Sequence, residues 1–163
     1  DKAALRRYFS ANAARARHHL TAGSELHYWL KLFNVDEVAD PIIKDLNLEG
    51  LEISPRFSFQ RSNTALPLHI DIDRIVGINL NLMHQPATIH MRGQAFEYEN
   101  CLIDVGSIPH SVEPIKMPRL VLKFAIRADW AEVKARLGSL ITYESDPNYE
   151  SVLHQEDTEL VKL

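Results

Sequence analysis

Residues 119–127 have the sequence Arg-Leu-Val-Leu-Lys-Phe-Ala-Ile-Arg, in which large apolar side chains occupy every second position. Successive side chains of a β-strand point to opposite faces, so one face of this segment is apolar. That face carries Leu120, Leu122, Phe124 and Ile126, and the other carries Arg119, Val121, Lys123 and Arg127. We expect the apolar face to pack on helices and Arg119 and Lys123 to point into the mouth of a barrel.

Seven more segments with β character precede this strand, and turn residues separate them. They cover approximately residues 51–57, 65–71, 74–82, 87–91, 94–99, 102–105 and 109–114. Short strands at such regular spacing are typical of antiparallel sandwiches and barrels. The sequence therefore predicts a mainly β protein with flanking α-helices, built on a double-stranded β-helix (jelly roll).

The N-terminal part is predicted to be helical. Residues 3–20 are rich in Ala, Leu and Arg, which favour helices. A second helix is expected over 25–33 with Ser24 as its N-cap, and a third over 35–46, where Pro41 either breaks or restarts it. After the β region, Asp129 is expected to cap a helix over 130–137 that Gly138 ends.

We therefore expect a single jelly-roll domain over residues 1–163. It would contain a helical N-terminal part (1–48) packed on one sheet, a β core (51–127), a helix (129–138) and a loosely held polar tail (143–163). For the Arg-rich N-terminal stretch, an organellar transit peptide is the alternative to an amphipathic helix. The chain begins with Asp1 rather than Met, so the presence of further N-terminal sequence stays an open question.

Composition excludes several classes of protein. The chain has 163 residues, of which 45% are hydrophobic, and no run approaches the roughly 20 apolar residues of a membrane-spanning helix. The formal net charge of −4 gives no basic footprint, which argues against nucleic-acid binding. A single cysteine, Cys101, allows no internal disulfide, so a reduced, cytoplasmic location is expected. The oligomeric state is not evident.

The segment Pro67-Leu-His-Ile-Asp71 carries the first chemical signal. His69 and Asp71 are separated by one residue, so a strand delivers both side chains to the same face. His110, at the start of a later predicted strand, is the candidate for a third ligand. Two His and one carboxylate on one side of a metal form the facial triad of non-haem Fe(II) oxygenases. We expect His69, Asp71 and His110 to bind a metal ion and to be the catalytic centre.

Arg119 lies nine residues after His110, and two neighbouring antiparallel strands can bring it back beside the metal. A guanidinium group can form a bidentate pair with a carboxylate. The distal carboxylate of 2-oxoglutarate is such a group.

The order of HID at 69–71, a distant His110 and then Arg119 resembles the signature of the Fe(II)/2-oxoglutarate-dependent oxygenases of the hydroxylase type. The resemblance implies a jelly-roll core, Fe(II), 2-oxoglutarate as co-substrate and O2. It also implies hydroxylation coupled to the formation of succinate and CO2. The interval of 39 residues between Asp71 and His110 is short for the family, and Val121 stands where many members have Ser.

Asn79 is a second candidate for co-substrate binding. It shares a strand face with Ile75, Gly77 and Asn81. That face points either into the barrel, where Asn79 could bond the co-substrate as in some relatives, or to solvent. No tyrosine can be assigned to the co-substrate from the sequence. The remaining histidines, including His18, His84 and His90, are expected to lie on helix surfaces, in loops or in the sheet.

The resemblance predicts an oxidoreductase, specifically a dioxygenase that hydroxylates an amino acid, a peptide side chain or another small metabolite. One alternative is a cupin-like, metal-dependent isomerase or dioxygenase that does not use 2-oxoglutarate. It fits less well, because cupins usually have two closely spaced His where this chain has HID. The other alternative is a noncatalytic jelly-roll binding protein.

Overall fold

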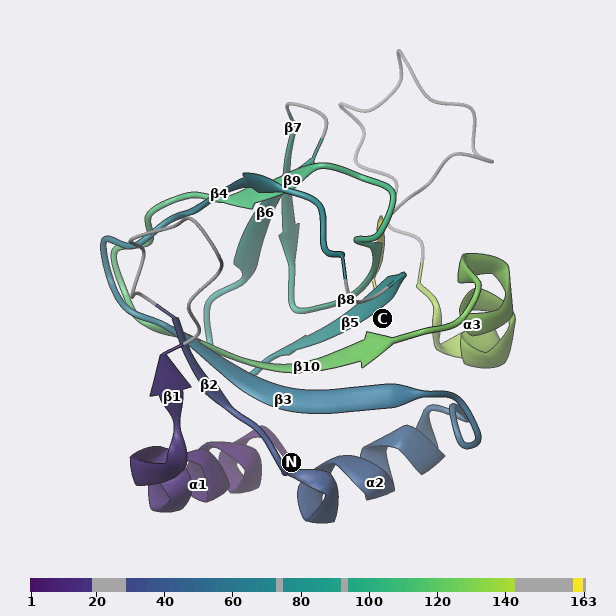
Figure 1. Cartoon of the computed structure of the whole chain (residues 1–163), viewed down its shortest axis with the longest axis horizontal. Helices are drawn as coiled ribbons and strands as arrows, with labels where there is room; N and C mark the ends of the chain where they lie inside the picture. Colours follow the sequence, from purple (N-terminus) through teal and green to yellow (C-terminus); the bar gives the residue numbers. More distant parts are fainter. Residues whose placement is uncertain (19–28, 73–74, 92–93, 143–159, 163) are drawn as a thin grey trace.

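A computed structural model of the chain describes residues 1–18, 29–72, 75–91, 94–142 and 160–162 (Figure 1). Its strands form two antiparallel sheets, one in the order β1-β2-β3-β10-β5-β8-β11 and the other in the order β4-β9-β6-β7. We call these the major and the minor sheet. The arrangement is the expected jelly roll with flanking helices.

The strands of the major sheet are β1 (Arg17–His18), β2 (Trp29–Leu32), β3 (Ile53–Gln60), β5 (Val76–Asn81), β8 (Asn100–Asp104), β10 (Arg119–Ile126) and β11 (Leu160–Lys162). Those of the minor sheet are β4 (Leu66–His69), β6 (Ala87–Met91), β7 (Gln94–Tyr98) and β9 (His110–Val112). The α-helices are α1 (Lys2–Asn12), α2 (Asp36–Asp45) and α3 (Trp130–Leu137).

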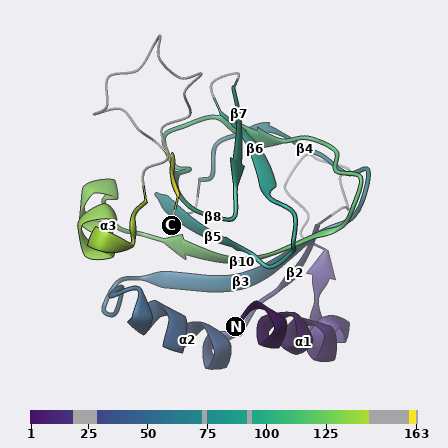
Figure 2. The ribbon, with the colours of Figure 1, turned by 180° about the vertical axis from the view of Figure 1, so that it is seen from behind.

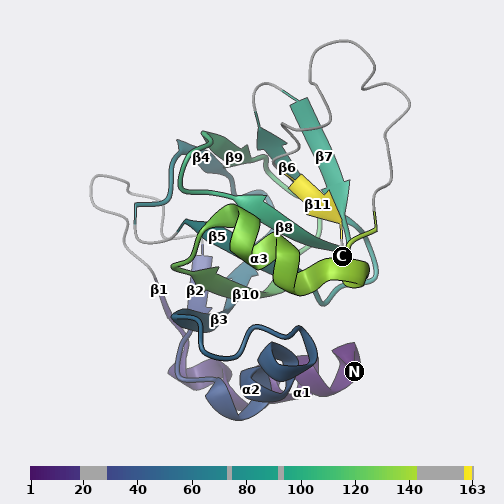
Figure 3. The same cartoon turned by 90° about the vertical axis from the view of Figure 1, so that its right-hand side faces the viewer.

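Helices α1 and α2 cover the outer face of the major sheet, and the minor sheet lies on its inner side (Figures 1 and 2). Helix α3 follows β10 directly and lies at one end of the sheets (Figure 1), so that it faces the viewer in Figure 3. The apolar side chains of β10 join the core between sheet and helices, with Phe9, Val35 and Ala39 from the helical side. The sequence prediction for the apolar face of β10 is thus confirmed.

A second apolar cluster fills the space between the two sheets. It includes Ile89, Met91, Ile103 and Val112, together with the buried Cys101. Because this cluster and the outer core lie on opposite faces of the major sheet, side chains that alternate along β10 serve different purposes. Those facing the helices stabilise the fold, and those facing the minor sheet line the interior.

All eight predicted β segments of the core are present, as is α3, with Asp129 accepting from the backbone N–H groups of Ala131 and Glu132. Helix α2 matches the third predicted helix and continues through Pro41. None of the described helices has the length and apolarity that a membrane crossing requires.

The first two helix predictions are wrong in part. Helix α1 ends at Asn12, whose side chain bonds the Tyr8 carbonyl at 3.0 Å, and a 3-10 turn leads into β1, where His18 lies. The helix predicted over 25–33 is a strand over 29–32, because β2 pairs with β3 along its whole length. This pairing places Trp29 against the inner cluster and Leu32 in the outer core, which outweighs local helix propensity. Ser24 lies outside the described residues.

The tail is also not loosely held at its end. Residues 160–162 form β11, which pairs with β8 through Leu160 and Ile103, Val161 and Leu102, and Lys162 and Cys101. Main-chain hydrogen bonds to a sheet edge order even a polar segment, and composition does not reveal them. Residues 143–159 lie outside the described part.

We predict that Phe57→Ala destabilises the protein by about 3–5 kcal/mol, as expected when a large buried side chain leaves a cavity. Phe57 is fully buried, and its ring lies 5.9 Å from Tyr8 and 5.7 Å from Phe9. Urea unfolding measures the change. The matched control Phe33→Ala, at a ring that is 41% exposed, should cost less than about 1 kcal/mol. Equal effects of the two substitutions would contradict this account of the core.

Candidate active site

The two candidate histidines lie at adjoining strand ends. His69 is the last residue of β4 and His110 is the first residue of β9, and the two are register partners in the minor sheet. The pairing of β4 with β9 shifts register between Leu66 and His69. The ring centroids of His69 and His110 lie 4.3 Å apart. Residues 41 positions apart in the chain thus present their rings side by side.

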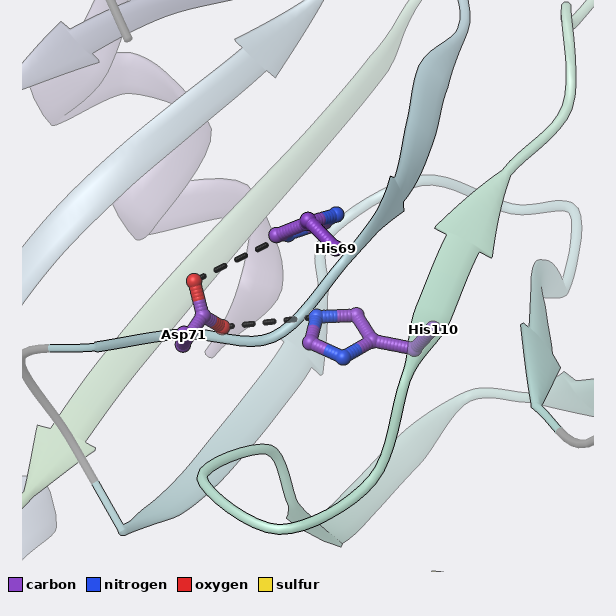
Figure 4. Close-up of side chains that lie close together, drawn as sticks. All are labelled: His69, Asp71 and His110. Atoms are coloured by element: carbon purple, nitrogen blue, oxygen red, sulfur yellow. Dashed lines mark ion pairs between the residues drawn. The ribbon is translucent and has the colours of Figure 1, made fainter. Parts of the chain in front are cut away.

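Asp71 completes the group. Its backbone N–H donates to the carbonyl of Val105 at 3.0 Å, which holds the chain after β4 beside the segment that leads to β9. Its carboxylate oxygens lie 3.7 Å from Nε2 of His69 and 3.3 Å from Nε2 of His110 (Figure 4). One ligand atom from each of the three residues lies within 4.8 Å of the others. The structure brings together the three residues that the sequence singled out.

Backbone carbonyls orient both imidazoles. Nδ1 of His69 lies 2.8 Å from the Pro67 carbonyl, and Nδ1 of His110 lies 3.0 Å from the Ile108 carbonyl. A carbonyl can only accept, so both Nδ1 atoms carry the proton and, in a neutral ring, both Nε2 atoms present a lone pair. In metal-bound His, the ring nitrogen that does not bind the metal usually donates its proton to a carbonyl or carboxylate in the same way.

Electrostatics favour a cation at this place. Burial lowers the pKa of His69, so its neutral, metal-binding form is favoured. Two nitrogen lone pairs and a carboxylate then face one another with no proton between them, which is unfavourable unless a cation lies among them. The donor set of two imidazoles and one carboxylate fits Fe(II). His110 is 3% exposed, whereas the other two side chains are partly open, which leaves an approach from one side.

Arg119 faces the interior, as the strand pattern predicts. It is 5% exposed, Nη1 donates to the Thr88 carbonyl at 3.2 Å, and the guanidinium carbon lies 5.4 Å from the ring centroid of Trp29. Nζ of Lys123 lies 5.2 Å from the same centroid. One indole ring therefore contacts two cations that point inward from β10, an arrangement in which cation–π attraction helps to hold each charge.

In the described part of the chain, several buried polar atoms on this inner face have no hydrogen-bond partner. Five of them are Trp29 Nε1, Ser58 Oγ, Gln60 Oε1, Asn79 Oδ1 and Arg119 Nε. A buried polar atom that is left unsatisfied costs about 1–3 kcal/mol, so such a concentration calls for an explanation. Three of the five groups are donors, and a carboxylate is the acceptor that suits them. The residues present therefore fit an anionic ligand such as 2-oxoglutarate.

Asn79 also faces the interior. It is 4% exposed, and Nδ2 lies 3.5 Å from the hydroxyl of Tyr98. Of the two orientations expected for this strand face, into the barrel or to solvent, the solvent-facing one is wrong. Its role toward a co-substrate stays a prediction.

Sequence reasoning missed three neighbours of Arg119 and Asn79. Trp29 lay within a predicted helix, and Gln60 lay beyond the predicted end of its strand, although it is the register partner of both Trp29 and Arg119. Tyr98 was within a predicted strand, but nothing in its own segment shows which face is inward. Cross-strand register would have revealed all three.

The other described histidines do not join the metal group. His90 pairs with Glu113 at 3.4 Å, and His84 is exposed in the loop after β5. Cys101 is buried as expected, and burial raises the pKa of its thiol, which makes a nucleophilic role unfavourable.

Comparison with known proteins places the fold. A prolyl-4-hydroxylase from Pseudomonas putida superposes with a TM-score of 0.61 at 18% identity, covering 78% of this chain and 86% of that one. A DMSP lyase from Ruegeria pomeroyi gives 0.56 at 20% identity, covering 78% and 64%. A viral collagen prolyl hydroxylase from Paramecium bursaria Chlorella virus-1, in complex with 2-oxoglutarate, gives 0.53 at 10% identity, covering 79% and 91%.

The chain shares the fold of these prolyl hydroxylases, in agreement with the expected jelly roll. No model of a protein family and no curated protein matches the sequence. At these identities the likeness concerns the fold, and the roles of individual residues depend on the geometry described above.

We predict that His110→Ala weakens Mn(II) binding by more than about a hundredfold. Substitution of a group that only orients a metal ligand already lowers metal affinity by about tenfold to a hundredfold, and His110 is expected to be a ligand itself. Electron paramagnetic resonance of free Mn(II) measures the affinity. The control is His90→Ala, which removes an imidazole from the strand next to β9. Its affinity should stay within about twofold of the unaltered protein. If the two substitutions weaken binding equally, the site is not the one described.

Proposed function

We propose that the protein is an Fe(II)- and 2-oxoglutarate-dependent dioxygenase. It would hydroxylate an amino acid, a peptide side chain or another small metabolite and release succinate and CO2. The observation that carries this proposal is the convergence of His69, Asp71 and His110 on one point. The unsatisfied polar atoms around Arg119 add support.

In this proposal His69, Asp71 and His110 hold the iron. The carbonyls of Pro67 and Ile108 keep both imidazoles in the tautomer that presents Nε2. Asp71 neutralises part of the metal charge, and its N–H bond to Val105 fixes the carboxylate near both rings. These contacts preorganise the ligands, so little rearrangement is needed when the metal binds.

When bound, Fe(II) with 2-oxoglutarate supplies the O2-dependent oxidation that the protein itself cannot perform. Arg119 would accept the distal carboxylate of 2-oxoglutarate in a charge-assisted pair. Lys123 adds a second positive charge on the same strand face, and Asn79 and Tyr98 add polar groups. Apolar side chains of the inner cluster, including Ile89 and Ile103, exclude water from this region.

The test uses protein purified without O2. Fe(II) and 2-oxoglutarate are added, O2 is admitted, and succinate is measured. We expect succinate above background, and its loss in His110→Ala. Metal binding without 2-oxoglutarate turnover or affinity would overturn the proposal in favour of a metal-dependent enzyme of another kind. Absence of metal binding would leave a noncatalytic protein.

We predict that Arg119→Gln weakens 2-oxoglutarate binding by about tenfold to a hundredfold, the equivalent of one lost charge-assisted hydrogen bond. Mn(II) affinity should be unchanged, because Arg119 is not among the metal-binding atoms. Isothermal titration with Mn(II)-loaded protein measures both affinities. Arg7→Gln makes the same substitution on the exposed face of α1 and should change neither. Unaltered 2-oxoglutarate affinity in Arg119→Gln would exclude this residue as the anchor.

A further inference from the structure

Trp29 adds a side chain from outside the predicted β core to the inner face of the major sheet. It is the first residue of β2 and the register partner of Gln60 on β3, which is in turn the partner of Arg119 on β10. Residues directly opposite one another on adjacent strands present their side chains to the same face of a sheet. Trp29, Gln60 and Arg119 therefore form one row of neighbouring side chains across three strands.

All three side chains of this row are almost fully buried. Trp29 is 7% exposed, Gln60 is 0% exposed and Arg119 is 5% exposed. Within the part of the chain that the structure describes, each has a buried polar atom without a hydrogen-bond partner, namely Nε1 of Trp29, Oε1 of Gln60 and Nε of Arg119. Buried polar atoms are normally bonded to protein, water or a ligand, so this row is a place that the side chains alone do not complete.

The donors of the row are the indole N–H of Trp29 and the Nε–H of Arg119. The amide nitrogen of Gln60 already donates to the Thr64 carbonyl at 2.7 Å and lies 3.4 Å from the Glu113 carbonyl. The remaining amide oxygen of Gln60 can only accept. An anion in this row would therefore be oriented toward Trp29 and Arg119 and away from that oxygen.

The indole ring also holds the guanidinium group in place. The guanidinium carbon of Arg119 lies 5.4 Å from the ring centroid, and its Nη1 donates to the Thr88 carbonyl at 3.2 Å. Cation–π attraction and this hydrogen bond together restrict the long side chain of Arg119. A ligand group that binds a restricted side chain loses less of its binding free energy to the ordering of that side chain.

We propose that Trp29 binds the distal carboxylate of 2-oxoglutarate together with Arg119 and makes the site selective for a co-substrate that has this carboxylate. The inference rests on the proposed function, because it concerns the co-substrate of the same site. The indole N–H and the Nε–H of Arg119 would both donate to the carboxylate, and the indole ring would hold the guanidinium for it. A strand that precedes the predicted β core would thus supply part of the co-substrate site.

The experiment compares two ligands and the two tryptophans of the chain. The ligands are 2-oxoglutarate and 2-oxopentanoate, in which a methyl group replaces the distal carboxylate. Trp130, on α3, packs against the outer core, so Trp130→Phe makes the same substitution away from the inner face as Trp29→Phe makes on it. Affinities are measured by isothermal titration of Mn(II)-loaded protein without O2.

We expect Trp29→Phe to weaken 2-oxoglutarate binding by about tenfold, the equivalent of one hydrogen bond to a charged group. Binding of 2-oxopentanoate should stay within about twofold, because phenylalanine keeps an aromatic face for Arg119 and lacks only the N–H. Trp130→Phe should change neither affinity. Mn(II) affinity should be the same in both variants, because Trp29 is not among the metal-binding residues.

Fluorescence gives a second measurement on protein in which Trp29 itself is unaltered. In Trp130→Phe, Trp29 is the only remaining tryptophan. A carboxylate bonded to the indole N–H changes the surroundings of the fluorophore. Adding 2-oxoglutarate should therefore change the emission to saturation, with a midpoint equal to the dissociation constant from titration, whereas 2-oxopentanoate should leave the emission unchanged.

Three results would overturn the inference and leave the proposed function intact. They are equal weakening of both ligands in Trp29→Phe, which indicates a structural role only, unaltered 2-oxoglutarate affinity in that variant, and 2-oxoglutarate binding without a change in Trp29 emission. If Trp29→Phe no longer binds Mn(II), or if 2-oxopentanoate binds too weakly to titrate, the fluorescence titration decides. Unaltered protein that binds Mn(II) but not 2-oxoglutarate would contradict the proposed function as well.

Discussion

The site depends on one electrostatic constraint, namely that three electron-pair donors point at one another. Nε2 of His69, Nε2 of His110 and the carboxylate of Asp71 converge, while backbone carbonyls hold the Nδ1 protons on the opposite side of each ring. The fold maintains this unfavourable contact through the β4–β9 pairing and the bond from Asp71 to Val105. A bound cation would turn the repulsion among the donors into coordination, so the geometry suits a metal ion.

The inner face of the major sheet extends the same logic to anions. Arg119 and Lys123 point inward from β10 around the ring of Trp29. A buried polar atom that lacks a hydrogen-bond partner is costly unless a ligand satisfies it. The Nε atoms of Arg119 and Trp29 are two such donors, and they suit the carboxylate that the proposed function assigns to Arg119.

Much of this arrangement was predictable from the sequence because a two-residue period determines which side chains share a face. That rule placed His69 with Asp71 and assigned Arg119 and Leu120 to opposite faces of β10, as the structure has them. It could not place Trp29, because β2 is held as a strand by its pairing with β3 rather than by its own composition. Nor could it reveal Gln60 or Tyr98, whose positions near Arg119 and Asn79 depend on which strands are neighbours across the sheets.

The most direct test of the central claim is a crystal structure of the protein grown without O2 with Mn(II) and 2-oxoglutarate. The account predicts one anomalous-scattering peak bonded by His69, Asp71 and His110, with the distal carboxylate of 2-oxoglutarate at Arg119. A metal peak elsewhere, or none at these three residues when Mn(II) is saturating, would contradict the account.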